Sequence, residues 1–211
     1  MYLPSQFESH NAEHAADLIG AHPLATLVSC DDQGDPFISH LPLHLERTGD
    51  RFVLLGHFAR GNPHWRLLEQ LPRAQALFMG PHAYLSPKVY PDLVRVPTWN
   101  YLAVHCRGEV RLIDEPEAKD RLLKRLIGDH EPPYAAQWRG LEPGYTSKML
   151  SGIVGFELPV RQWVCKLKLN QHRSEAHAAM RADYAVGNDN ERALADWMRR
   201  LNMNDPAPDD H

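Results

Sequence analysis

The sequence predicts a mainly β fold, a small antiparallel barrel with helices attached. Six or more short segments have the apolar or alternating pattern of strands, and turns rich in Gly, Pro, Asp and Asn join them. Helical patterns stand between them irregularly, which does not fit the strict strand–helix alternation of a doubly wound sheet. Because a closed barrel of this size leaves little room inside, a large ligand is expected on its outside or in a subunit interface.

The first half of the chain predicts two helices among short strands. Ser9 or Asn11 can cap the first helix, which ends before His22-Pro23. Strands are predicted at 24–29, 37–45 and 52–57, with turns at 31–36 and 47–50. The second helix is predicted to start at Asn62-Pro63, and a strand follows at 74–80, with 83–87 as its partner or a flanking arm.

The second half predicts one long strand, two shorter strands and two amphipathic helices. Alternation over 99–113 indicates the long strand, in which Gly108 marks a bulge or bend. An apolar stripe predicts a helix from 115 to about 129, and strands are expected at 153–158 and 163–169. The last helix covers 193–201, and a frayed tail is expected over 202–211.

The composition is that of an ordinary soluble globular protein, with 43% hydrophobic and 24% charged residues in 211. A formal net charge of −4 gives no general attraction to nucleic acid or to an anionic membrane. No apolar run approaches the ~20 residues of a membrane helix and no signal-peptide pattern begins the chain, so we expect a cytoplasmic protein. Cys30, Cys106 and Cys165 are far apart, which favours reduced thiols.

Common chemical fingerprints are missing from the sequence. GxSxG, HExxH, P-loop and GxGxxG motifs are all absent, so the chain lacks the usual nucleophile, zinc-protease and nucleotide signatures. His40 and His44 lie four apart on one strand face, but this spacing is not a known ligand motif. With 13 histidines in the chain, chance explains the pair better than a metal, and no metal site is expected.

Segment 56–65 has the pattern of a strand end, a tight turn and a helix start. Asn62 suits the N-cap, and Pro63 suits the first helical position, where its missing N–H costs nothing. Unpaired helix N–H groups, with His57 and Arg60 on the approaching turn, would form an anion site of the kind that receives phosphate. An ordinary capped helix with a surface arginine explains the same residues.

Two further segments have the composition of binding surfaces. Tyr84, Tyr90, Trp99 and Tyr101 lie in Pro-rigidified segments beside Ser, Thr and Asn, which suits a planar ligand or, alternatively, aromatic core packing. The basic run at 166–173 could bind phosphates of DNA or of a cofactor, and its alternative is a solvated strand edge.

The sequence resembles the PaiB family, flavin-binding-type proteins described as negative transcriptional regulators. The motifs that carry the resemblance are MYLP at 1–4 with Phe7, ISHLP at 38–42, GHFARGNPHW at 56–65, FMGPHAYLSP at 78–87 and VPTWNY at 96–101. They extend from the first residue to about Phe156. The family's late motif Gly-Lys-x-Lys-Leu-Ser-Gln-Asn is altered at 165–172, where Cys165, Asn170 and His172 replace Gly, Ser and Asn.

This resemblance implies a six-stranded antiparallel split β-barrel of FMN-binding type over 1–158 and a C-terminal strand and helix extension over 159–211. It also implies a homodimer with each FMN in a groove between two barrels. Ser39 and His40 would lie beside the isoalloxazine ring, with His57, Arg60 and Asn62 around the phosphate. Thr98, Trp99 and Asn100 would approach from the partner chain or from the same groove.

Three function classes follow from these observations. In the first, the FMN-binding dimer acts as a regulator; no helix-turn-helix is recognisable, so DNA would meet the basic residues Arg161, Lys166, Lys168, Arg173 and Arg181. The second is a flavin-dependent reductase or oxidase of a small molecule, in which His40 or His105 could move protons and no catalytic pair is assigned. The third is haem binding through a histidine ligand, as in related split barrels.

Overall fold

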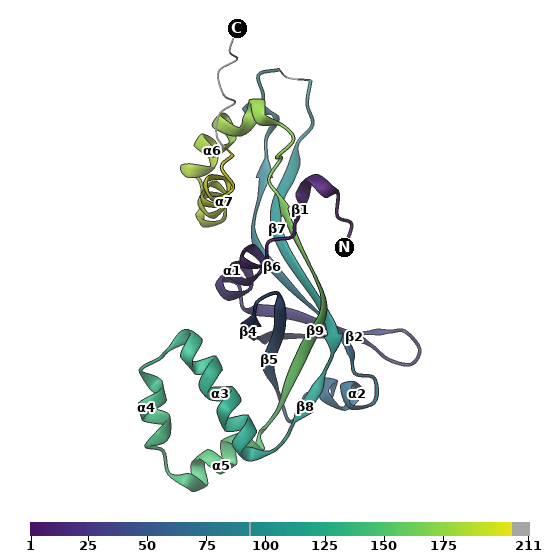
Figure 1. Cartoon of the computed structure of the whole chain (residues 1–211), viewed down its shortest axis with the longest axis vertical. Coiled ribbons are helices and arrows are strands. Elements are labelled where there is room, and N and C mark those ends of the chain that lie inside the picture. The colour runs from purple at the N-terminus through teal and green to yellow at the C-terminus, as the bar shows by residue number, and fades with distance from the viewer. Residues whose placement is uncertain (93, 204–211) are drawn as a thin grey trace. The chain divides into compact units, whose positions relative to one another are not determined.

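The computed structural model describes residues 1–92 and 94–203, in which nine strands form a mainly antiparallel sheet accompanied by seven α-helices (Figure 1). The strand order is β3-β2-β6-β7-β9-β5-β4, and β1 and β8 both pair with β9. The strands are β1 (Glu8–Ser9), β2 (Leu24–Cys30), β3 (Pro36–Pro42), β4 (His44–Thr48), β5 (Arg51–Ala59), β6 (Arg73–Leu85), β7 (Thr98–Glu109), β8 (Arg111–Ile113) and β9 (Ile153–Lys168). The helices are α1 (Ala12–Ala21), α2 (His64–Gln70), α3 (Pro116–His130), α4 (Tyr134–Arg139), α5 (Pro143–Ser151), α6 (His177–Ala185) and α7 (Asp189–Arg200).

Contacts divide the chain into two compact units, and strands β6, β7 and β9 pass from one to the other. The central unit comprises residues 19–78 and 105–163, and the terminal unit comprises 1–18, 79–104 and 164–211. The boundary expected from the sequence, after residue 158, falls within β9. It follows the extent of the family motifs rather than the contacts, and it stays a prediction.

The central unit is built from two hairpins whose ends approach one another. β2 pairs with β3, and β4 pairs with β5, which also pairs with β9. β3 contacts both β5 and α2, although it stands far from β5 in the strand order. The strands therefore curve toward closure, as a small barrel requires. Helix α3 covers part of this sheet by packing Leu122 and Leu126 against Leu55.

The terminal unit has its own core beneath the C-terminal helices. Tyr184 of α6 is almost completely buried, and its hydroxyl accepts a hydrogen bond from Asn100 Nδ2 at 3.1 Å. A capping box starts α7, because the Asn188 side chain and the Glu191 side chain each accept the other's backbone N–H. Figure 1 shows α6 and α7 close together, and they are in direct contact.

The predicted strand boundaries needed four corrections. The long strand expected at 99–113 is divided at Val110 into β7 and β8. The expected strand at 37–45 is broken, because Leu43 is buried between β3 and β4 and its N–H bonds the carbonyl of Pro23 at 3.0 Å. Segments 74–80 and 83–87 form one strand, β6, whose buried and exposed residues change alternation at Gly80 and Pro81. Segments 153–158 and 163–169 likewise merge into β9, in which Pro159 keeps its place opposite Val53 of β5.

Helix prediction succeeded where the apolar stripe was long or, for α2, where Asn62-Pro63 marked the helix start. Helices α1, α2, α3 and α7 match the sequence expectations to within a few residues. Helices α4, α5 and α6 have six to nine residues and were not predicted, since so few turns give little periodic signal. From residue 204 onward, the expected frayed tail lies outside the described residues.

Gly108 is required by a close approach of strands, and replacing it is expected to destabilise the protein. A Cβ at this position would overlap the carbonyl oxygen of Pro159 and lie 3.0 Å from Leu158 Cδ1. Because the first of these atoms belongs to the backbone, the strand itself must shift. We expect Gly108→Ala to lower the free energy of unfolding by about 1–2 kcal/mol in urea titrations.

Gly128 supplies the matched control for this substitution. It lies in helix α3, and a Cβ at its position would meet nothing within 4 Å. Gly128→Ala is therefore expected to raise the free energy of unfolding by about 0.5–1 kcal/mol, because alanine favours the helix. Equal effects of the two substitutions would contradict the close-approach explanation.

Candidate functional site

A buried histidine joins α2 to two strands of the central unit. His64 Nδ1 lies 2.8 Å from Ser39 Oγ, and His64 Nε2 lies 2.9 Å from Ser29 Oγ. Asn62 Nδ2 donates to Ser39 Oγ at 3.1 Å, while Asn62 Oδ1 accepts the backbone N–H of His64 at 3.0 Å. We call Ser29, Ser39, Asn62 and His64 the His64 network. Helix α2 starts at His64 with Pro63 as its N-cap, one residue later than the sequence predicted, and Asn62 still accepts the first helical N–H.

The His64 ring is enclosed by aromatic side chains. Its centroid lies 4.6 Å from that of Phe37 and 5.4 Å from that of Phe58, and the residue is completely buried. Burial lowers the pKa of His64 to about 4, so the ring is neutral at pH 7. The sequence did not predict this network, because Ser29 and Ser39 are far from His64 along the chain and contact it only in the folded structure.

Arg60 lies at the end of β5 and is held by several groups. Its Nη1 and Nη2 donate to the two Asp114 oxygens at 3.0 and 2.5 Å, and Nη2 and Nε also reach the carbonyls of Ile153 and Ser151. Lys119 Nζ lies 2.9 Å from Asp114 Oδ1. We call Arg60, Asp114 and Lys119 the Arg60 cluster. Hydrogen bonds from Arg60 and then Lys119 lower the pKa of Asp114 to about 2.

The Arg60 cluster keeps one net positive charge at neutral pH, because two cations surround one carboxylate. The guanidinium has five N–H groups, and its hydrogen bonds to Asp114, Ile153 and Ser151 use four of them. Lys119 is 3% exposed, so its charge is shielded from water, whereas Asp114 is 57% exposed. The cluster can therefore still attract an anion, although the Asp114 carboxylate competes for the arginine.

The two remaining predicted histidines differ in their surroundings. His57 lies on β5 opposite Gly155, and its buried Nδ1 has no hydrogen-bond partner among the described residues. Burial lowers the pKa of His57. His40 is exposed on β3, where its Nδ1 lies 3.2 Å from Thr26 Oγ1. His57 thus has a buried nitrogen that is free to bind a ligand, whereas His40 faces solvent.

Thr98, Trp99 and Asn100 belong to the terminal unit. Lys168 Nζ donates to Thr98 Oγ1 at 2.7 Å and to the Trp99 carbonyl at 2.6 Å. The Trp99 side chain is half exposed and meets Tyr84 edge-on, with the ring centroids 6.5 Å apart. Asn100 is fully buried, and its Oδ1 has no partner among the described residues. Trp99 is therefore open to a ligand, whereas Asn100 is a core residue.

The basic residues expected to meet DNA make contacts within the protein. Lys166 is buried at 4% exposure, donates to the Tyr2 carbonyl at 2.9 Å and lies 5.0 Å from the centroid of the Tyr101 ring. The alternative of a solvated strand edge is therefore wrong for Lys166. The other contacts are Lys168 with Thr98, Arg161 with Glu109 at 2.8 Å, Arg173 with Glu175 at 3.8 Å, and Arg181 with the Met203 carbonyl at 2.9 Å.

Two features of the described residues bear on broader function classes. No group of three or more His, Cys, Asp or Glu side chains in residues 1–92 and 94–203 is arranged to hold a metal ion. Within the same ranges, every helix is too short or too polar to cross a membrane.

The chain is similar to known proteins in sequence and in fold. Residues 1–162 match the family described as "Putative FMN-binding domain". The chain is 36% identical over 178 residues to the protease synthase and sporulation protein PAI 2 of Bacillus subtilis, a match that covers 83% of this chain and 84% of that protein. The predicted PaiB resemblance is thereby confirmed.

Two solved structures share the fold with a TM-score of 0.57 each. One is described as a "putative 5-nitroimidazole antibiotic resistance protein" of Bacteroides thetaiotaomicron, with 14% identity over 75% of this chain and 85% of that chain. The other is an FAD and haem binding protein of Mycobacterium smegmatis, with 24% identity over 76% of this chain and 73% of that chain. At these identities the likeness establishes the fold alone, and the predicted split barrel is confirmed. With more than half of its length matched, the chain belongs to the FMN-binding domain family and is a PaiB-type member of it.

Proposed function

We propose that this protein binds FMN and acts, as a cytoplasmic homodimer, in negative transcriptional regulation. The observation that carries the flavin assignment is the Arg60 cluster, with its net positive charge at the end of β5 that also holds His57. FMN ends in a phosphate dianion, for which an arginine N–H and a protonated imidazole nitrogen are suitable partners. FMN supplies hydride or electron transfer when it is bound.

The residues of the central unit fit the phosphate of FMN in three respects. Arg60 retains one N–H that no described group accepts, and His57 Nδ1 is buried without a partner among the same residues. Gly61 follows Arg60 in the turn with nothing within 4 Å of its Cβ position, which leaves the approach to the backbone open. In this proposal Ser39, His40 and Asn62 line the flavin side of the site, and Thr98, Trp99 and Asn100 stay candidate flavin contacts, from the partner chain or from the same groove.

Replacing Arg60 tests this assignment. We expect Arg60→Gln to weaken FMN binding about tenfold and riboflavin binding much less, because riboflavin lacks the phosphate. Calorimetric titration of both flavins measures the two affinities, and circular dichroism verifies that the variant is folded. Equal loss of both flavins would contradict the phosphate assignment.

Arg66 provides a control for the charge that this substitution removes. Its guanidinium lies 4.7 Å from the centroid of the Trp65 ring, one residue away, and it makes no ion pair with Asp114. Arg66→Gln is expected to leave the ratio of the FMN and riboflavin affinities unchanged.

The absorption spectrum of the complex gives an independent readout, because a Soret band in place of flavin bands would favour haem and contradict the proposal.

The assembly and the location are supported by weaker observations. Cys30, Cys106 and Cys165 form no disulfide, which fits a reducing compartment such as the cytoplasm. Light scattering at micromolar concentration is expected to give twice the chain mass of 24.1 kDa, and the mass of a single chain would contradict the homodimer. For regulation, direct DNA binding would have to draw on Lys168 and its basic neighbours, which already have partners in the chain.

A further inference from the structure

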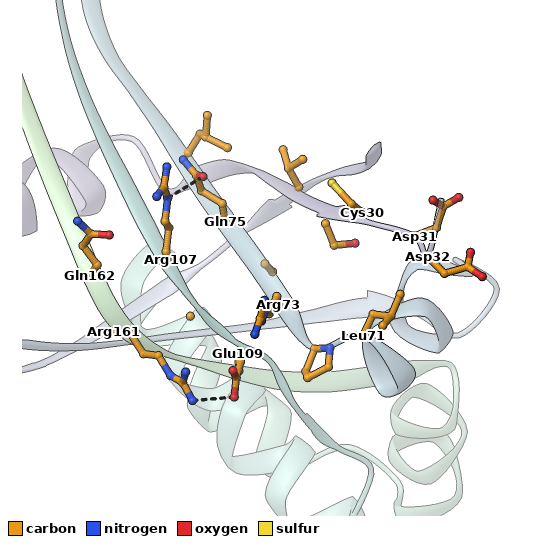
Figure 2. Close-up of a pocket in the computed structure, with 16 residues that line it drawn as sticks. Cys30, Asp31, Asp32, Leu71, Arg73, Gln75, Arg107, Glu109, Arg161 and Gln162 are labelled. Atoms are coloured by element: carbon orange, nitrogen blue, oxygen red, sulfur yellow. Dashed lines mark hydrogen bonds and ion pairs between the residues drawn. The ribbon is translucent and has the colours of Figure 1, made fainter. Parts of the chain in front are cut away.

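An open hollow of about 1000 Å³ lies on the central unit, outside the residues assigned to FMN. It is formed by residues of β2, β6, β7 and β9 and of the segment before β6 (Figure 2). Val28 and Leu77 are half-buried in its wall, and Leu71 is an exposed apolar residue at its edge. This volume lies at the upper end of the range typical of small-molecule sites. The apolar walls suit the body of an organic ligand.

Arg107 is oriented in this hollow by a hydrogen-bonded relay. Its Nε donates to Gln75 Oε1 at 3.1 Å, and Gln75 Nε2 lies 2.9 Å from His105 Nδ1. Arginine only donates hydrogen bonds, so the amide oxygen of Gln75 must face it and the amide nitrogen must face His105. His105 Nδ1 is then an acceptor, and the imidazole is neutral. Burial and the charge of Arg107 both lower the pKa of His105, in agreement with this state.

The relay leaves the anion-binding end of Arg107 available. Among the described residues, no hydrogen bond or ion pair involves the Nη atoms of Arg107 or any side-chain nitrogen of Arg73. The third arginine of the hollow, Arg161, is paired with Glu109 at 2.8 Å, as the dashed line in Figure 2 indicates. Arg107 thus presents a fixed fork of two terminal nitrogens, the geometry that binds a carboxylate with two hydrogen bonds.

The opposite end of the hollow is negatively charged. Figure 2 shows Asp31 and Asp32 at one end, beside Cys30, and Arg107 with Gln75 toward the other. Asp31 Oδ1 already accepts the backbone N–H groups of Gln33 and Asp35 at 2.9 and 2.8 Å, which fixes this carboxylate in the turn. A ligand with an acidic group at each end would meet repulsion there. The charge distribution therefore favours a single acidic group at the Arg107 end.

We propose that this hollow binds a small organic acid with an aromatic or otherwise apolar body and one carboxylate. The carboxylate pairs with the Nη atoms of Arg107, with Arg73 adding positive charge, and the body lies against Val28 and Leu77. The site is separate from the residues assigned to FMN, and it does not depend on flavin binding.

Calorimetric titration of the full chain with naphthalene-2-carboxylate tests the chemistry of the ligand. We expect saturable binding of this probe, about tenfold weaker binding of the uncharged naphthalene-2-carboxamide, and weaker binding of naphthalene-2,6-dicarboxylate because of Asp31 and Asp32. Lack of saturable binding, or equal binding of all three compounds, would overturn the proposal.

Two variants and one competition experiment locate the site. Arg107→Gln is expected to weaken carboxylate binding about tenfold while leaving carboxamide binding unchanged. Arg51→Gln removes the same charge from an exposed position outside the hollow and should change neither affinity. Repeating the titration with saturating FMN should give the same affinity, and displacement of the probe by FMN would contradict a separate site. Because the probe is titrated without flavin as well, this test stands even if FMN does not bind.

Discussion

Lowering the pH from 7 to 5 is expected to reduce the free energy of unfolding by about 2 kcal/mol through His64 alone. The pKa of His64 is about 4 in the folded protein, against an ordinary value of 6.5 for a histidine in water. Between about pH 4 and 6.5, the His64 ring therefore binds a proton in the unfolded chain and stays neutral in the folded chain. The stability due to the neutral ring is complete above pH 6.5 and is lost as the pH falls toward 4.

The low pKa of His64 in the folded protein has a structural cause. A protonated His64 ring would be completely removed from water in the folded protein. Both of its nitrogens would then have to donate hydrogen bonds, one to Ser29 Oγ and one to Ser39 Oγ. Ser39 Oγ already receives a hydrogen bond from Asn62 Nδ2, and no carboxylate among the described residues contacts the ring to compensate a positive charge. Protonation thus costs desolvation without a balancing ion pair.

Urea unfolding at both pH values measures the effect. His64→Gln is expected to be less stable at pH 7 and to lose about 2 kcal/mol less than the wild type between pH 7 and 5. His10, whose side chain is 84% exposed, provides the control, and His10→Gln should retain the full pH dependence. His57 and His105 also have lowered pKa values, so the contribution of His64 is the difference between wild type and variant. An unchanged pH dependence in His64→Gln would refute the assignment.

Local patterns predicted those parts of the site that depend on neighbouring residues. Asn62 and Pro63 indicated the start of α2, and the structure has the Asn62 side chain capping the His64 N–H. The partners of the same residues come from far along the chain and left no local signal. Asp114 lies 54 residues from Arg60, and Ser39 lies 25 residues from His64. The packing of α2 on β3 and the pairing of both β5 and β8 with β9 bring such residues together.

The fold shows the same division between local and distant causes. Alternation and turn residues located nearly every strand, and the family motifs indicated the barrel. Glycine and proline usually interrupt strands, so these residue types were misleading in β6 and β9. Here Gly80 lies within β6 and Pro159 lies within β9. Gly80 is needed where its backbone meets Leu18 and Leu102, whose atoms would lie 2.9 and 3.3 Å from a Cβ at this position. Such a close approach is a property of the folded chain.

Asp114→Asn is expected to destabilise the protein and, at the same time, to strengthen FMN binding. Lys119 is 3% exposed and has Asp114 as its ion-pair partner, so loss of the carboxylate leaves a buried ammonium without compensation. Complete burial of such a pair would make the loss larger, but Asp114 is 57% exposed, and we expect the free energy of unfolding to fall by about 2–3 kcal/mol. Removing Lys119 as well, in Asp114→Asn/Lys119→Met, should recover part of this loss.

The acid dependence of stability provides a second readout for Asp114. Its pKa is about 2 in the folded protein, below the ordinary value of 3.8, so the carboxylate stabilises the folded state above about pH 4. This contribution is lost as the pH falls through about 2. Urea titrations across this range should show a smaller acid-induced loss in Asp114→Asn than in the wild type, whereas Asp50→Asn, at an exposed turn position, should behave like the wild type.

The gain in FMN affinity follows from competition for one guanidinium. In the wild type the two Asp114 oxygens occupy Arg60 Nη1 and Nη2, and a phosphate must share or displace them. The amide introduced by Asp114→Asn carries no charge, so Arg60 is freed and the net charge of the cluster rises from +1 to +2. We expect FMN to bind several-fold more tightly to this variant and riboflavin to bind as before. If the variant is folded and destabilised but its FMN affinity is unchanged, Asp114 has only a structural role and the phosphate does not bind at Arg60.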